Sequence, residues 1–194
     1  MFSVMPRVGV REVLVEAAVT EFHRHGYAAC SVEIITKAAG VPKGSFYNHF
    51  ASKEQLGAEV VARYAAGSAW WKEVDPGLSP LAQLRARFRA VVDMLAESRF
   101  TRGCLLGNMG AEVADHSDVI RTQVDLSLCQ WTANIVASLR AARAAGEIGA
   151  GTDVERLGPF LLNAFQGAIM HSKVVRCVEP LEDFLSVAFD SVLR

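Results

Sequence analysis

Residues 38–50 read AAGVPKGSFYNHF and contain the turn that decides the fold. Gly40 suits the positive φ that ends a helix, and Pro42 suits the first turn of the helix that follows. Two helices joined by a short glycine-containing turn are typical of the helix-turn-helix motif. The stretch therefore predicts such a motif, with Ser31 as the N-terminal cap of the helix before the turn.

The helix after the turn has an apolar side and a polar side. Phe46 and Phe50 are four residues apart, so both can face a core. The other side carries hydrogen-bonding groups of the kind that phosphates and base edges require. Gly44 costs about 1 kcal/mol inside a helix, and close approach to DNA would explain that cost. The alternative is a small helical domain with a solvated polar face.

Apolar residues recur every three or four positions along most of the chain, as one face of a helix requires. Examples of this spacing are Leu14, Ala18 and Phe22, then Leu84, Phe88 and Val91, then Leu128, Trp131 and Ile135. The sequence has no sustained two-residue alternation of apolar residues and no Asn-Gly or Asp-Gly hairpin turn, so nothing in it indicates a strand. The sequence therefore predicts an all-α fold of about nine helices, interrupted most strongly at residues 75–80.

Composition excludes several classes of protein. The chain has 194 residues, of which 51% are apolar and 21% charged, and its formal net charge is −1. These values exclude a disordered chain and a uniformly basic coat for nucleic acid. Because no apolar run reaches the length of a membrane span, we expect no membrane association and a soluble, cytoplasmic protein. The four cysteines form no CxxC pair, so we expect free thiols, no metal site and no cofactor.

The helix-turn-helix stretch lies in a longer pattern that resembles the DNA-binding domain of TetR-type regulators. The similarity covers residues 8–56 without gaps and includes Gly26, Tyr27, Ser31 and residues 38–50. It implies an all-helical homodimer on a palindromic operator in double-stranded DNA. It also implies a DNA-binding domain at residues 1–52 and a helical sensor and dimerisation domain at residues 53–194. Most such regulators are repressors that leave DNA when a small molecule binds.

The resemblance also implies which residues contact DNA. Base contacts fall at the start of the helix after the turn, and phosphate contacts fall further along it and on the flanking helices. The candidate DNA-binding residues are Ser31, Lys43, Gly44, Ser45, Tyr47, Asn48, His49 and Lys53. Cys30 replaces the threonine that is usual in the family. Glu33 stands where some members have a DNA-facing residue, and it can face either a cytosine amino group or solvent.

Three short segments resemble the branch of electrophile- and oxidant-sensing regulators typified by the N-ethylmaleimide repressor. They are Gly103-Cys104-Leu105, Ala111-Glu112-Val113 and His171-Ser172-Lys173, in the same order as in that branch. There the cysteine at the position of Cys104 is the sensor, and the lysine at the position of Lys173 is its partner. Residues 106–108 differ from that branch, so an electrophile, an oxidant and a noncovalent small-molecule inducer all remain open.

The position of Cys104 suggests a reactive thiol. Gly103 predicts a helix start, which places Cys104 in the first helical turn, near Arg99 and Arg102 in sequence. Such surroundings lower a thiol pKa, so Cys104 is expected to react fastest of the four thiols. The alternative is a buried, inert cysteine. The candidate sensor residues are Cys104, Asn108, Trp131, His171 and Lys173.

The last two helices are the predicted dimer interface. Apolar residues between residues 160 and 169 occupy more than one face of a helix, which indicates burial on several sides. The candidate interface residues are Phe160, Ala164, Phe165, Gly167, Ala168, Phe184 and Phe189. A central core helix in a monomer is the alternative.

The sequence indicates a DNA-binding regulator rather than an enzyme. The competing hypothesis is a small helical enzyme or carrier that uses Cys104 covalently on an electrophile. A nucleophilic cysteine needs a base and a group that orients the base, and no recognisable pattern supplies them. We therefore assign no catalytic residue.

Overall fold

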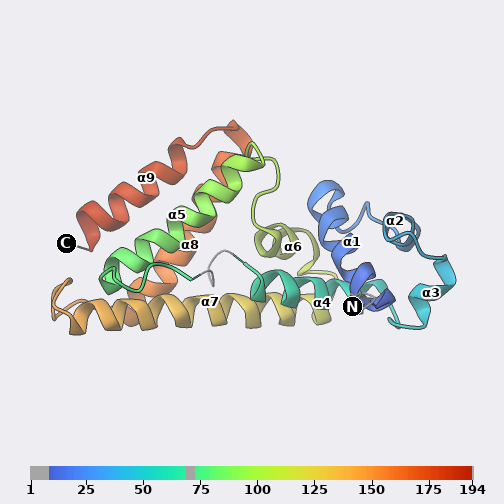
Figure 1. The fold of residues 1–194 in the computed structure, drawn as a ribbon, viewed down its shortest axis with the longest axis horizontal. Helices are drawn as coiled ribbons and strands as arrows, with labels where there is room; N and C mark the ends of the chain where they lie inside the picture. Colours follow the sequence, from blue (N-terminus) through green and yellow to red (C-terminus); the bar gives the residue numbers. More distant parts are fainter. Residues whose placement is uncertain (1–8, 69–72, 194) are drawn as a thin grey trace, which may run out of the picture.

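The computed structural model describes residues 9–68 and 73–193, and within these ranges the chain is helical, without strands, as the sequence predicts (Figure 1). Nine α-helices and a terminal π-helical turn, η2, are present in those ranges. Their bounds are α1 Val10–His25, α2 Val32–Ala38, α3 Lys43–Tyr47, α4 Lys53–Ala66, α5 Pro80–Glu97, α6 Leu105–Val113, α7 Asp118–Ala144, α8 Val154–Val175, α9 Glu179–Val187 and η2 Ala188–Val192.

Helices α1, α2 and α3 form a small unit at one end of the molecule, on the right in Figure 1. Its core includes Leu14, Phe22 and Ile35, together with Phe46 and Phe50, whose ring centroids lie 5.6 Å apart. The prediction that these last two phenylalanines face a core is confirmed. Since both lie on one side of the short segment that includes α3, its polar side is left outward.

The turn between α2 and α3 has the local chemistry that the sequence indicates. The Ser31 hydroxyl accepts a hydrogen bond from the backbone N–H of Ile34 at 3.2 Å and caps α2. Gly40 has a φ of 67°, which a residue with a side chain rarely adopts. Pro42 directly precedes α3. These local features set the angle between the two helices of the motif.

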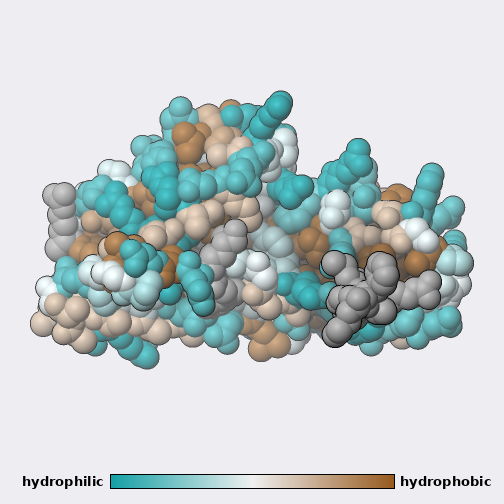
Figure 2. Space-filling view, viewed as in Figure 1, coloured by the Kyte–Doolittle hydropathy of each residue, from teal (hydrophilic) through white to brown (hydrophobic). Residues whose placement is uncertain are grey.

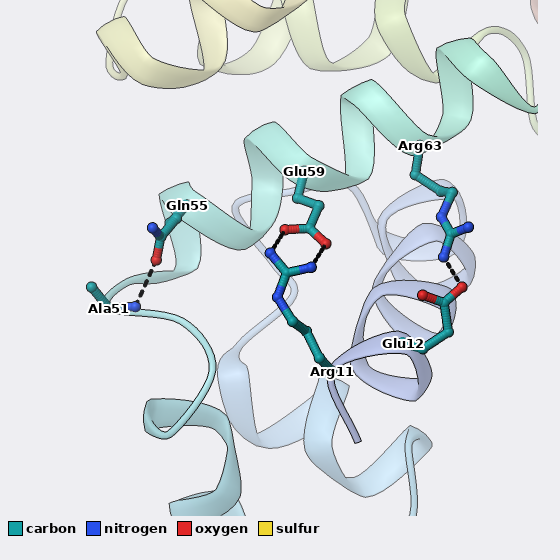
Figure 3. A network of polar contacts seen from close by, with 6 residues as sticks. All are labelled: Arg11, Glu12, Ala51, Gln55, Glu59 and Arg63. Carbon is teal, nitrogen blue, oxygen red and sulfur yellow. Dashed lines mark hydrogen bonds and ion pairs between the residues drawn. The ribbon is translucent and has the colours of Figure 1, made fainter. Parts of the chain in front are cut away.

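Helix α4 joins this unit to the rest of the molecule, since it packs against both α1 and α7. Two ion pairs tie α1 to α4, Arg11 with Glu59 and Glu12 with Arg63 (Figure 3). At the start of α4 the Gln55 side chain accepts a hydrogen bond from the backbone N–H of Ala51 at 2.8 Å. A movement of α4 would therefore carry α1 with it.

The larger part of the molecule is built on the long helix α7, which runs beneath α5 and α8 in Figure 1. Helices α7 and α8 approach closely at Gly158, where a Cβ would lie 2.4 Å from the Val136 side chain. Above them, Phe88 packs against three other rings at centroid distances of 4.9, 5.1 and 5.7 Å. These rings belong to Phe165, Phe184 and Phe189.

This aromatic core corrects part of the predicted dimer interface. Phe165, Phe184 and Phe189 are buried within one chain, because they lie on the sides of α8, α9 and η2 that face α5. Phe160 is 59% exposed, and Gly167 is also exposed. Ala164 and Ala168 are half-buried beside the core. None of the helices within residues 9–68 and 73–193 has the length and apolar character needed to cross a bilayer.

Candidate DNA-binding surface and effector cavity

The outer surface of α2 and α3 carries the predicted DNA-binding side chains. Tyr47 is 60% exposed, and Ser31, Lys43, Asn48 and His49 are also exposed, while Ser45 is half-buried. Hydrophilic side chains dominate this edge of the molecule, at the right of Figure 2. Nothing within the described chain lies within 4 Å of a Cβ placed on Gly44. A DNA backbone could therefore approach α3 closely at this position.

Lys43 has a partner on the same surface. Its ammonium lies 3.6 Å from the carboxylate of Glu33, and both side chains are largely exposed. Glu33 thus faces solvent in the absence of DNA, beside the start of α3. Because exposed ion pairs contribute little energy, a phosphate or base edge could replace the carboxylate at small cost.

A cavity of about 550 Å³ lies between α6 and α8. Cys104, Asn108 and Lys173 all line this cavity, so the structure brings together three of the predicted sensor residues. The Lys173 ammonium donates to the Asn108 side-chain oxygen at 3.4 Å, and the Asn108 amide donates to the Arg102 carbonyl at 2.9 Å. The Lys173 stem packs against Gly103.

Cys104 is the N-terminal cap residue of α6 and is buried. The Gln166 side-chain amide donates to its sulfur at 3.4 Å. Burial raises the thiol pKa, and the hydrogen bonds from the Gly107 backbone, Gln166 and the Leu106 backbone oppose that rise only in part. The thiol is therefore protonated in its resting state at neutral pH.

Models of two protein families match the chain. The model described as "Bacterial regulatory proteins, tetR family" matches residues 14–60, and the model described as "Tetracyclin repressor-like, C-terminal domain" matches residues 80–188. The chain belongs to the TetR family. The family resemblance in residues 8–56 is thereby confirmed.

Full-length similarity to known TetR-family proteins supports the same assignment. The chain is 35% identical to the HTH-type transcriptional repressor DhaR of Mycobacterium sp. strain GP1, over 97% of this chain and 95% of DhaR. The chain is also 32% identical in sequence to regulatory protein TetR from Rhodobacter sphaeroides. The crystal structure of that protein matches this one with a TM-score of 0.84 over 93% of this chain and 96% of that one. Reduced NemR of Escherichia coli is 27% identical, with a TM-score of 0.77 over 94% and 96%.

Two predicted sensor residues lie elsewhere in this TetR-family chain. The His171 side chain is exposed and does not line the cavity. Trp131 is buried on the other side of Cys104, where its indole N–H donates to the Ala65 carbonyl at 3.3 Å. Gln166 and Arg176, which the sequence did not single out as sensor residues, also line the cavity. The helical spacing of Gln166 and Lys173, seven residues apart, was the available signal.

The expectation of a reactive Cys104 thiolate is wrong for the resting protein. Arg99 and Arg102 are exposed rather than directed at the sulfur, and desolvation dominates the thiol pKa. Cys129 is the exposed cysteine, whereas burial raises the pKa of Cys30 to about 11. Cys104 is therefore less accessible to reagents than Cys129.

Lys53 is also placed differently from the free phosphate contact that the family implies. Its ammonium donates to the carbonyls of Tyr27 at 2.8 Å and Cys30 at 3.0 Å. It also lies 4.0 Å from the centroid of the Tyr27 ring. Lys53 therefore anchors the α1–α2 turn to α4 in this TetR-family structure.

Across the described ranges, no three side chains of His, Cys, Asp or Glu converge to form a metal site. One histidine, His23, nevertheless has a shifted pKa. His23 packs edge-on against Tyr64 at a centroid distance of 5.4 Å, and its Nδ1 is buried without a hydrogen-bond partner. Desolvation lowers its pKa to about 4, and the positive charges of Arg102 and Lys173 act in the same direction.

We expect His23 to make folding stability depend on pH between about 6.5 and 4. The unfolded chain binds a proton near pH 6.5, whereas the folded chain binds it only near pH 4. Stability should fall by about 3 kcal/mol as pH drops through this window. His23→Phe should remove that part of the slope in urea titrations at a series of pH values. Identical slopes for both proteins would contradict this assignment.

Proposed function

We propose that this TetR-family chain is a homodimeric transcriptional repressor that binds a palindromic operator through α3. It releases the operator when a small molecule occupies the cavity lined by Cys104, Asn108 and Lys173. The single observation that carries the proposal is this cavity, because its walls come from two helices of the sensor domain and hold polar groups that can fix a ligand. Relatives named as transcriptional repressors favour this function over an enzyme or carrier.

An exposed apolar face supports the homodimer. On α8 the residues of this face recur at helical spacing, and the face continues onto α9. Its exposed members are Phe160, Gly167, Met170, Val174 and Val187. Exposed apolar residues gathered on two packed helices are typical of an interaction surface. A twofold dimer would present two α3 helices to the two halves of a palindrome.

The same face borders the effector cavity. Met170 and Val174 line the cavity as well as lying on the exposed side of α8. A partner copy packed on α8 would cover part of the opening. Occupation of the cavity could then alter both the dimer arrangement and α6, which is how one ligand would shift the spacing of two α3 helices.

The cavity walls indicate the chemistry of the inducer. Lys173 and Arg176 contribute positive charge, Asn108 contributes an amide, and none of the described residues that line the space carries a carboxylate side chain. A small molecule with a carboxylate or carbonyl group suits these donors. Cys104 lies on the same wall, so an electrophile held there could form a covalent bond with its sulfur.

DNA recognition can be tested with the duplex upstream of the protein's own gene. Lys43→Ala should reduce discrimination between that duplex and a scrambled one by about tenfold, because base contacts carry specificity. Tyr47→Phe should instead weaken binding to both duplexes by a similar factor, because phosphate contacts carry no sequence information. Fluorescence anisotropy at fixed salt would measure both effects. Equal affinity of the unaltered protein for the two duplexes would refute operator recognition.

A further inference from the structure

Glu112 connects the sensor domain to the DNA-binding domain through two hydrogen bonds. Its carboxylate, near the end of α6, accepts the backbone N–H of Tyr27 at 2.9 Å and that of Ala28 at 2.7 Å. These amides lie in the turn between α1 and α2, about 85 residues away along the chain. One carboxylate therefore holds two adjacent amides of the unit that carries α3.

The turn that Glu112 holds has little room to move independently. Gly26 has a φ of 79°, and a Cβ at this position would lie 3.0 Å from the Glu112 carboxylate. The Tyr27 ring lies against α4, where a Cβ on Gly57 would be 3.0 Å from it and 2.8 Å from Ile120 of α7. Lys53 holds the turn from α4 through the two carbonyls described above. The turn is thus fixed between α4 and α6.

The other end of α6 forms the wall of the effector cavity. Cys104 directly precedes the helix, and Cys104, Asn108 and Ala111 all line the cavity. Glu112 directly follows Ala111, and it lies eight positions after Cys104, a rise of only about 12 Å along a helix. Since an α-helix of this length moves as one body, displacement of its cavity-lining side would displace the Glu112 carboxylate.

We propose that Glu112 is the positioning residue that transmits occupation of the cavity to the DNA-binding domain. A group placed beside Cys104 shifts α6, and the two hydrogen bonds of Glu112 carry that shift into the α1–α2 turn and so to α2 and α3. This coupling rests on the proposed function for its biological meaning. The mechanical link itself can be measured without DNA.

The test uses iodoacetamide as a probe of defined size in a Cys129→Ser, Cys177→Ser background. The Cys104 thiolate displaces iodide and forms a carbon–sulfur bond; intact mass confirms one adduct, and peptide mapping places it on Cys104 rather than on Cys30. Hydrogen exchange at the amides of Tyr27 and Ala28 is then followed by NMR. We expect the adduct to accelerate exchange at both amides by about tenfold, within the usual range of coupling between sites. Unchanged exchange would overturn the proposal.

Glu112→Gln separates transmission from simple stabilisation. Glutamine keeps one acceptor oxygen but presents an amide donor to the second backbone N–H, so one bond is lost. In this variant the two amides should exchange faster before modification, and the adduct should add little. Glu97→Gln, at an exposed position at the end of α5, is the matched control and should behave as the unaltered protein.

Operator affinity distinguishes the coupling from the proposed function. If the adduct accelerates exchange in the turn while operator affinity is unchanged, the coupling stands and the proposed function fails. If Glu112→Gln lowers thermal stability yet leaves the effect of the adduct on exchange at full size, Glu112 is only a structural contact. That second result would contradict the coupling.

Discussion

Replacing Phe165 with alanine should lower the free energy of unfolding by about 3–5 kcal/mol, the usual cost of removing a buried phenylalanine. Its side chain is fully buried, with ring centroids of Phe88 and Phe184 each 4.9 Å away. The variant would leave a cavity where α5, α8 and α9 meet. Urea unfolding followed by circular dichroism would measure the loss.

A variant with a smaller loss of side-chain volume tests the cause of that loss of stability. Phe165→Leu keeps most of the apolar volume and should recover roughly half of the lost stability. The core assignment would be refuted by a Phe165→Ala protein that unfolds at the same urea concentration as the unaltered chain but dissociates into monomers more readily. That result would assign Phe165 to the dimer interface rather than to the core.

Replacing Phe160 with aspartate should convert the proposed dimer to a monomer at micromolar concentration. Phe160 lies on the exposed side of α8, so the change should leave the monomer folded. In a twofold interface it would bury two uncompensated charges, at a cost of about 3–5 kcal/mol for each. Operator affinity should then fall by at least about 100-fold, because one half-site contributes only part of the binding energy.

Sedimentation velocity and fluorescence anisotropy would measure these two effects on the same protein. Val119→Asp introduces the same charge at an exposed valine in the first turn of α7 and is the matched control. It should remain a dimer with unchanged operator affinity. A dimeric Phe160→Asp protein that binds the operator normally would show that the exposed face of α8 is not the interface.

The helix-turn-helix motif could be predicted from the sequence because its determinants are local. Ser31 caps the helix that begins at the next residue, and Gly40 supplies a positive φ inside the turn. The spacing of Phe46 and Phe50 gives the buried side of the segment that contains α3 without knowledge of any other helix. Each of these features depends on residues within about four positions of one another.

The division of α8 between core and surface could not be predicted in the same way. Apolar residues surround this helix, so a period of 3.6 residues does not say whether Phe160 or Phe165 faces inward. The choice depends on Phe88 of α5 and Phe184 of α9, which reach Phe165 only in the folded chain. Sequence spacing therefore does not tell which apolar side chains of α8 lie in the core of the chain and which lie on its surface.

Long-range contacts also explain the errors at Cys104 and Lys53. The sequence placed Cys104 within one position of its site at the start of α6, but its pKa depends on burial and on Gln166, 62 residues away. The carbonyl partners of Lys53 lie 23 and 26 residues earlier. By contrast, Cys104, Asn108 and Lys173 line one cavity because they lie at the start of α6, on α6 and on α8, two regular helices.

Operator affinity of protein with a single adduct at Cys104 tests most directly whether the cavity controls DNA binding. Extended iodoacetamide treatment above neutral pH, in the Cys129→Ser, Cys177→Ser background, would overcome the raised thiol pKa, and peptide mapping would verify a single adduct at Cys104 rather than at Cys30. We predict operator binding at least about tenfold weaker than that of the unmodified protein in the same anisotropy titration. Equal affinity of the two preparations would contradict control of DNA binding by this cavity.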